Sequence, residues 1–297
     1  MNPLAMTRRA LGLYVASLMV VVTGCSGPSS DATTTPADPQ PLNVIIVSDL
    51  SDRLAHPQQR ERDRMVLRAC TQAFQERCRR VGYPLCKDVI RFQSVRTTPS
   101  ATDIQVDVGA LNAPSPGQDH SPVVTAIGPS LDRFVVTAMK EYDAGFTPEG
   151  ADLWLYFKDQ FGVLLKPGYR NKVILLTDGY LNFDPATQAT RPARTYMQVG
   201  RLRVVPDWRT EFPKVALAAT GTSFHDRDVE MVVLEVAPKL QPRSIHETEI
   251  LQRYWTSFCD SIGVQHQPAE RSVLTNTTPE SEVRRLLTDY LAGELKP

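Results

Sequence analysis

The sequence predicts an α/β fold, a doubly wound and mostly parallel six-stranded sheet with helices on both faces. Two apolar runs carry this prediction, LNVIIVSD at 42–49 and KVILLTDG at 172–179. Because these runs are apolar almost to their carboxyl ends, both faces of each strand must be buried, as in a parallel sheet between helix layers. Segments of helical periodicity alternate with the strands, which is the order of a doubly wound sheet. The 297 residues suffice for one large domain of this kind.

The first 24 residues have the features of an export signal. Arg8 and Arg9 form a basic region, and the apolar run at 11–22 is too short to span a bilayer. The sequence VTGC at 22–25 resembles the lipobox of bacterial lipoproteins, which implies cleavage before Cys25 and attachment of lipid, palmitate included, to that residue. An ordinary secretory leader and a chance cytosolic N-terminus are the alternatives. Ser26 resembles the residue after the cysteine in lipoproteins sent to an outer membrane, facing the periplasm if the source has two membranes.

This interpretation divides the chain into three parts. Residues 1–24 form the signal peptide, residues 25–41 a flexible tether rich in Ser, Thr, Pro and Asp, and residues 42–297 the folded domain. Loss of Arg8 and Arg9 with the leader takes the formal charge from zero to −2. We therefore expect a membrane-anchored protein of the cell envelope without nucleic acid as a partner, because no basic excess is present.

The strands are predicted from apolar runs in chain order. The run at 104–111 alternates apolar and polar residues, which indicates a half-buried strand near an edge of the sheet. The others are expected to be buried. The six predicted strands lie at 42–49, 89–95, 104–111, 172–179, 229–236 and 263–267.

The predicted helices connect these strands. Pro57 suits the first turn of a helix at 57–81, and Gly82 suits its end. Further helices are expected at 131–142, 151–165, 244–262 and from 278 onward. The helix at 244–262 begins at the capping box of Ser244 and Glu247. The connection 182–227 is an unusually long insertion, and such connections are often functional. We expect it to cover the carboxyl edge and to contain a hairpin at 197–205.

Four cysteines follow the lipobox: Cys70, Cys78, Cys86 and Cys259. Export permits disulfides, and the spacing lacks the C-x-x-C pairs of zinc sites. Cys78 ends the first helix and Cys86 follows a short turn, so their Cα atoms can come within disulfide range. Right-handed crossovers place the helices of Cys70 and Cys259 on opposite faces of the sheet. We therefore predict a Cys78–Cys86 bridge.

Two of the apolar runs end in a carboxylate, Asp49 and Asp178. In open α/β sheets, ligands bind outside the carboxyl ends of the strands, at the point where strand order reverses. We therefore expect the two carboxylates to meet in that crevice.

The residues around these carboxylates resemble the metal-ion-dependent adhesion site of von Willebrand factor type A domains. That family has D-x-S-x-S, G-G-T-D-L and T-D-G motifs, and the chain has DLSDR at 49–53, EGADLW at 149–154 and TDG at 177–179. As an order of elements the resemblance covers about 42–297. It implies a Rossmann-like fold and a divalent ion, Mg²⁺ or Mn²⁺, bound by Asp49, Ser51 and Asp178. Arg53 and Ala151 stand where the family has two further hydroxyl ligands.

Three outcomes are open at this site. Asp152 or Thr147 could supply the missing oxygens, which would complete a site for a hard cation. Alternatively, Arg53 could replace the ion as an internal counter-charge, because close carboxylates repel without a cation between them. In the third outcome Arg53 points to solvent, and Asp49 and Asp178 only cap turns and helices.

The predicted function is the binding of another protein at the crevice, by an adhesion or scaffold module on a lipid anchor. The alternative is a metal-dependent envelope hydrolase acting on phosphoesters. The sequence has no G-x-S-x-G motif and no P-loop, and its five histidines are scattered without metal-ligand spacing. No catalytic residue is therefore assigned.

Overall fold

The computed structural model describes residues 40–56, 58–96, 104–113, 123–145, 151–181, 189–190, 192, 194–239 and 246–293. The predicted signal peptide, the predicted lipidation site Cys25, the tether up to residue 39 and the possible ligand Thr147 lie outside these residues. Among the helices that the structure describes, none combines the length and apolar character needed to cross a bilayer.

The core of the domain is a six-stranded sheet in the order β3-β2-β1-β4-β5-β6. Only β3 runs antiparallel to its neighbour among these strands. The predicted α/β class and mostly parallel six-stranded sheet are therefore confirmed. The strands are β1 Leu42–Asp49, β2 Val89–Val95, β3 Ile104–Asp107, β4 Arg170–Leu176, β5 Val229–Val236 and β6 Val273–Thr275.

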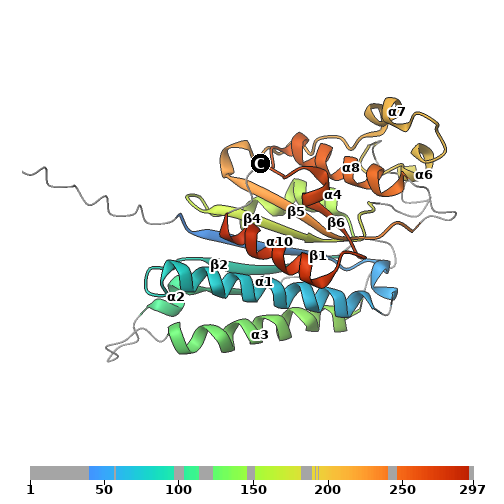
Figure 1. Cartoon of the computed structure of the whole chain (residues 1–297). Coiled ribbons are helices and arrows are strands. Elements are labelled where there is room, and N and C mark those ends of the chain that lie inside the picture. Colours follow the sequence, from blue (N-terminus) through green and yellow to red (C-terminus); the bar gives the residue numbers. More distant parts are fainter. Residues whose placement is uncertain are drawn as a thin grey trace, which may run out of the picture. The chain divides into compact units, whose positions relative to one another are not determined.

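Helices cover both faces of the sheet (Figure 1). Alternate residues of β1 enter two separate cores, Val44 and Ile46 on one face and Ile45 and Val47 on the other. The first core contains α1 Gln59–Val81, α3 Val123–Asp143 and α10 Glu280–Ala292. The second contains α4 Leu153–Asp159, α6 Val199–Leu202, α7 Trp208–Val215 and α8 Glu247–Ile262. Shorter elements are η1 Asp52–Ala55, α2 Val108–Asn112, η2 Phe161–Leu164, η3 His225–Arg227 and α9 Ala269–Ser272.

The predicted sixth strand at 263–267 is wrong. Gly263 ends α8 at φ +73°, and beyond it only Gln265 forms an isolated bridge, to Glu230. The true edge strand is β6, which is three residues long and therefore too short to show a period of its own. The predicted hairpin at 197–205 is also wrong, because Val199 and Leu202 are buried three residues apart on the single helical turn α6.

Several other boundaries differ from those predicted. The third strand ends at Asp107, because the Asp107 side chain accepts a hydrogen bond from the backbone N–H of Ala110 (3.1 Å) and caps α2. Helix α3 begins eight residues before the predicted start, at Val123, and continues through Pro129. The helix predicted at 151–165 is divided into α4 and the 3₁₀ turn η2. Helix α8 begins at Glu247, and Ser244 of the predicted capping box lies outside the described residues.

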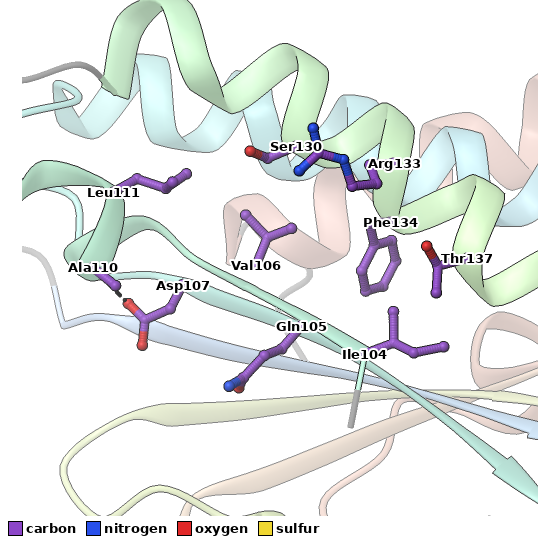
Figure 2. A pocket seen from close by; sticks show the side chains of 10 residues that line it. All are labelled: Ile104, Gln105, Val106, Asp107, Ala110, Leu111, Ser130, Arg133, Phe134 and Thr137. Atoms are coloured by element: carbon purple, nitrogen blue, oxygen red, sulfur yellow. Dashed lines mark hydrogen bonds between the residues drawn. The ribbon is translucent and has the colours of Figure 1, made fainter. Parts of the chain in front are cut away.

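A hollow of about 440 Å³ lies between the edge strand β3 and helix α3. Figure 2 shows Ile104 of β3 beneath Phe134 of α3, with Val106 of β3 to one side of that ring. The carboxylate in this hollow, Asp107, is occupied by the α2 cap and by an ion pair with Lys166 (3.4 Å). We therefore assign no functional site here.

Candidate functional site at the carboxyl edge

The ends of β1 and β4 bring the two predicted carboxylates to one edge of the sheet. Ser48 of β1 pairs in register with Leu176 of β4, so Asp49 and the Thr177-Asp178 sequence follow side by side. The chain leaves β1 toward β2 on one side, whereas β4 leads to β5 on the other, so the strand order reverses here. Asp49 and Asp178 therefore lie at the predicted crevice, and both are almost fully buried.

Asp49 is held by donors from both neighbouring loops. Its Oδ2 accepts a hydrogen bond from the Thr177 hydroxyl (2.7 Å), and its Oδ1 accepts one from the backbone N–H of Ser51 (3.0 Å). Burial and then the nearby charge of Asp178 raise the pKa of Asp49 to about 6. Arg53 and the two hydroxyls of Thr177 and Ser51 oppose that rise.

Arg53 points inward and is only 1% exposed. Its Nη2 donates to Asp63 of α1 (2.6 Å) and to the Ser48 hydroxyl (3.2 Å), and its Nε donates to the backbone carbonyl of Asp49 (2.7 Å). Burial opposes the guanidinium charge and lowers the pKa of Arg53, but Asp63, Tyr142 and Asp49 together outweigh burial, so the net shift of that pKa is upward. The solvent-facing alternative for Arg53 is therefore wrong, and its direct ionic partner is Asp63 rather than the two predicted carboxylates.

A second cation, Lys239, occupies the other side of the crevice. Its Nζ forms ion pairs with Asp178 and with Asp52 of η1, the latter at 3.2 Å. Burial lowers and these two carboxylates raise the pKa of Lys239, and the net shift is upward. Its backbone N–H also donates to the hydroxyl of Tyr180 (3.1 Å). The crevice thus holds a guanidinium against β1 and an ammonium against β4.

A third cation extends this network toward β5. Arg62 of α1 forms two hydrogen bonds with the buried Glu235, through Nε (2.6 Å) and Nη2 (2.9 Å). Gln59 donates to both Glu235 (3.0 Å) and Asp63 (2.9 Å) and so joins the Arg62 pair to the Arg53 pair. Glu235 has φ +73°, a left-handed conformation that is uncommon for residues other than glycine, beside an irregularity in the β5–β6 pairing.

Sequence reasoning missed Asp63, Lys239 and Glu235. A signal for Asp63 was present, because it lies on the buried face of α1 at helical spacing from Val66 and Cys70. Lys239 follows the end of β5 by three residues, and neighbouring parallel strands end at one edge. The bend at Glu235 has no counterpart in the sequence pattern.

The side chains present do not suit a divalent ion. Ala151 is buried in the core and offers no oxygen, and Asp152 accepts from the backbone N–H of Leu155 (3.0 Å) as the cap of α4. The crevice already holds the two cations Arg53 and Lys239, which would repel a metal ion. An octahedral hard-cation site needs several free oxygens, and Asp49 already accepts from Thr177 and Ser51.

Cys78, near the end of α1, and Cys86, just before β2, lie together at the amino edge of the sheet. Their sulfurs and a carboxylate oxygen of Asp88 lie within 4.8 Å of one another. Both residues are free thiols in this structure, so the predicted bridge stays a prediction. Asp88 accepts from Arg77 (2.9 Å) and from the backbone N–H of Leu42 (2.8 Å), so both of its oxygens are already engaged.

Cys70 and Cys259, also buried thiols, belong to the cores on opposite faces of the sheet. This placement agrees with right-handed crossovers between the parallel strands.

A groove of about 720 Å³ opens beside Lys239 at the same carboxyl edge. It is formed by the first turn of α1, the segment after β5, the beginning of α8 and the turn after β6. The lining residues are His56, Gln58, Gln59, Arg62, Ala237, Pro238, Lys239, Thr248, Thr275, Asn276 and Thr277.

Comparisons with known proteins leave the family open. The sequence matches none of the protein-family models, and no curated protein matches it. Among solved structures, the chain is similar to the pilus adhesin SpaC from Lactobacillus rhamnosus GG in its open conformation, with 12% identity and a TM-score of 0.37. The match covers 86% of this chain and 30% of the adhesin. A similarity at this level carries no argument about function.

Proposed function

We propose that this chain is a lipid-anchored cell-envelope protein whose von Willebrand factor A-like domain binds another protein at the carboxyl edge of its sheet, without a metal ion. One observation carries the proposal: the DLSDR and TDG motifs meet at adjacent strand ends, with a guanidinium and an ammonium beside their carboxylates. The motifs resemble an adhesion site, and the two cations supply the charge that the resemblance assigns to an ion.

The arrangement favours binding over catalysis. Within the described residues the crevice side chains are engaged in hydrogen bonds and ion pairs with one another, and none forms a nucleophile with an adjacent base. Buried ion pairs hold the loops after β1 and β5 in fixed positions. Fixed loops lower the entropy that a binding surface loses when a partner docks.

The binding proposal is tested by photo-crosslinking in intact envelopes. A photoreactive residue at the exposed Thr277, which lines the groove, is expected to capture a discrete protein, and EDTA is expected to leave the capture unchanged. Val163 is the matched control, because it is 83% exposed and lies on η2, the turn that precedes β4 at the amino edge. No product at Thr277, or equal products at both positions, would contradict the proposal, as would metal-dependent turnover of phosphoesters by the purified chain.

The anchor requires its own experiment. Cys25→Ser is expected to abolish lipid attachment, and therefore to move the protein from the detergent phase to the aqueous phase or to leave it unprocessed. Labelled palmitate should enter the wild type and not the variant. Unchanged partitioning of Cys25→Ser would exclude lipidation at this residue.

A further inference from the structure

The ionisable side chains that line the groove beside Lys239 are basic. Among the described residues that line it, the ionisable ones are His56, Arg62 and Lys239, which are all bases, and none is a carboxylate. Arg62 pairs with Glu235, which is 1% exposed, and Lys239 pairs with Asp178, which is 3% exposed. Asp52, the second partner of Lys239, is exposed but is not among the residues that line the groove. The remaining polar lining consists of amides and hydroxyls, which can donate hydrogen bonds.

The guanidinium of Arg62 is held through its Nε and Nη2 atoms. Glu235 occupies its Nε and one Nη2 donor, and the carbonyl of Thr278 accepts a further bond from Nη2 (3.2 Å). Its Nη1 makes no hydrogen bond within the described part of the chain. Because these bonds already hold the guanidinium in place, its remaining N–H groups can bind a ligand with little further loss of side-chain entropy.

The helices that bound the groove add to this donor character. The first turns of α1 and α8 contribute Gln59 and Thr248 to its wall. The N-terminal ends of these 23- and 16-residue helices carry the positive end of the helix dipole. Lys239 stands at the boundary between the groove and Asp178, so the groove continues the crevice.

We propose that this groove binds carboxylate side chains of an acidic segment on the partner protein, with Arg62 Nη1 and Lys239 as the charged donors. This inference rests on the proposed protein-binding function and specifies the chemistry of the partner. Since both cations are already paired with acids of the chain itself, their attraction for a further carboxylate acts at short range. Affinity for one carboxylate is therefore low, and several carboxylates in one segment are needed for stable binding.

The test uses the full chain in detergent and a dye-labelled hexaglutamate peptide, with hexaglutamine and hexalysine as controls. Fluorescence anisotropy should show saturable binding of hexaglutamate alone. Thr277→Glu places a like charge in the groove and is expected to weaken binding about threefold to fivefold, the effect of one exposed charge pair. Val163→Glu adds the same charge at the amino edge and should leave the affinity unchanged.

The contribution of Arg62 is measured with the double variant Arg62→Met/Glu235→Gln, which leaves no unpaired buried carboxylate. Loss of its charge-assisted bond is expected to weaken hexaglutamate binding about tenfold. Binding of hexalysine instead, equal affinity in Thr277→Glu and Val163→Glu, or displacement by inorganic phosphate at the peptide's own concentration would overturn the inference. A discrete crosslink at Thr277 together with any of these results would leave the protein-binding function standing and remove only the acidic-segment assignment.

Discussion

The two ends of the sheet both contain buried ions, but they differ in balance. At the amino edge Asp88 has one cationic partner, Arg77, and one backbone donor, the N–H of Leu42. At the carboxyl edge three cations, Arg53, Arg62 and Lys239, meet four buried carboxylates, Asp49, Asp63, Asp178 and Glu235, and the exposed Asp52. A balanced pair that ties a strand to a helix is sufficient for stability, whereas an excess of buried acid opposes folding. This excess is the structural difference that the proposed binding role of the carboxyl edge would explain.

The difference in stability between the two edges should be largest when Arg53 of the carboxyl edge and Arg77 of the amino edge are each replaced. Arg53→Met leaves Asp63 buried without its cation and is expected to lower the free energy of unfolding by about 3–5 kcal/mol. Arg77→Met should cost about 1–3 kcal/mol, because Asp88 keeps the N–H of Leu42. Urea unfolding of both variants measures the two losses. A larger loss at Arg77 would show that the carboxyl-edge pair is dispensable.

The same position separates a counter-charge from a degenerate metal site. Arg53→Ser removes the guanidinium and places a hydroxyl in the D-x-S-x-S pattern at 49–53. Calorimetry is expected to detect Mg²⁺ or Mn²⁺ binding to Arg53→Ser and none to the wild type. Micromolar Mg²⁺ affinity in the wild type would show that Arg53 does not stand in for an ion.

At the amino edge, the largest remaining effect is expected from the Cys78–Cys86 bridge. Closing this nine-residue loop should add about 2–3 kcal/mol under oxidising conditions, on the chain-entropy account. The wild type should therefore lose stability on addition of dithiothreitol, whereas Cys78→Ala should be insensitive to it. Cys259→Ala is the control and should keep the wild-type response. Peptide mapping that finds Cys70 joined to Cys259 would contradict the predicted pairing and the two-faced topology.

The sequence was sufficient to predict the parts of the fold that depend on apolar runs. The strands β1, β2 and β5 have the predicted boundaries. Strands β1 and β5 are buried on both faces almost throughout, and β2 is buried except at Arg91 and Gln93. Strand β6 was not predicted, because three residues are too few to show the alternation of apolar and polar side chains. The positions of Asp49 and Asp178 followed from the rule for strand ends, but their cations did not. Arg53 pairs with Asp63, and Lys239 pairs with Asp178, because folding packs separate segments together. The local sequence pattern does not predict such contacts.

The unbalanced edge should also show in the pH dependence of stability. The pKa of Asp49 rises from 3.8 to about 6 on folding, so between these values the folded state binds more protons than the unfolded state. This contribution favours folding fully below pH 3.8 and is lost as pH rises to about 6, at a cost of roughly 2–3 kcal/mol. Asp49→Asn removes the ionisation, so its stability relative to wild type should increase between pH 4 and pH 6. A difference that does not vary with pH would mean that Asp49 is ionised without cost.

The smallest expected effect concerns Lys239, which is 29% exposed and therefore partly screened by solvent. Lys239→Met should cost about 1 kcal/mol, and a double-mutant cycle with Asp178→Asn should recover most of that loss as coupling energy.

A second measurement separates an electrostatic role of Lys239 from packing. Without the ammonium, the charge of Asp178 acts on Asp49 with less compensation, so the pKa of Asp49 should rise further above 6 in Lys239→Met. Carbon-detected NMR of the Asp49 carboxyl follows that titration directly. An unchanged Asp49 titration would show that Lys239 contributes by packing on Tyr180 (5.6 Å from the ring centroid), and that Arg53 alone balances the crevice.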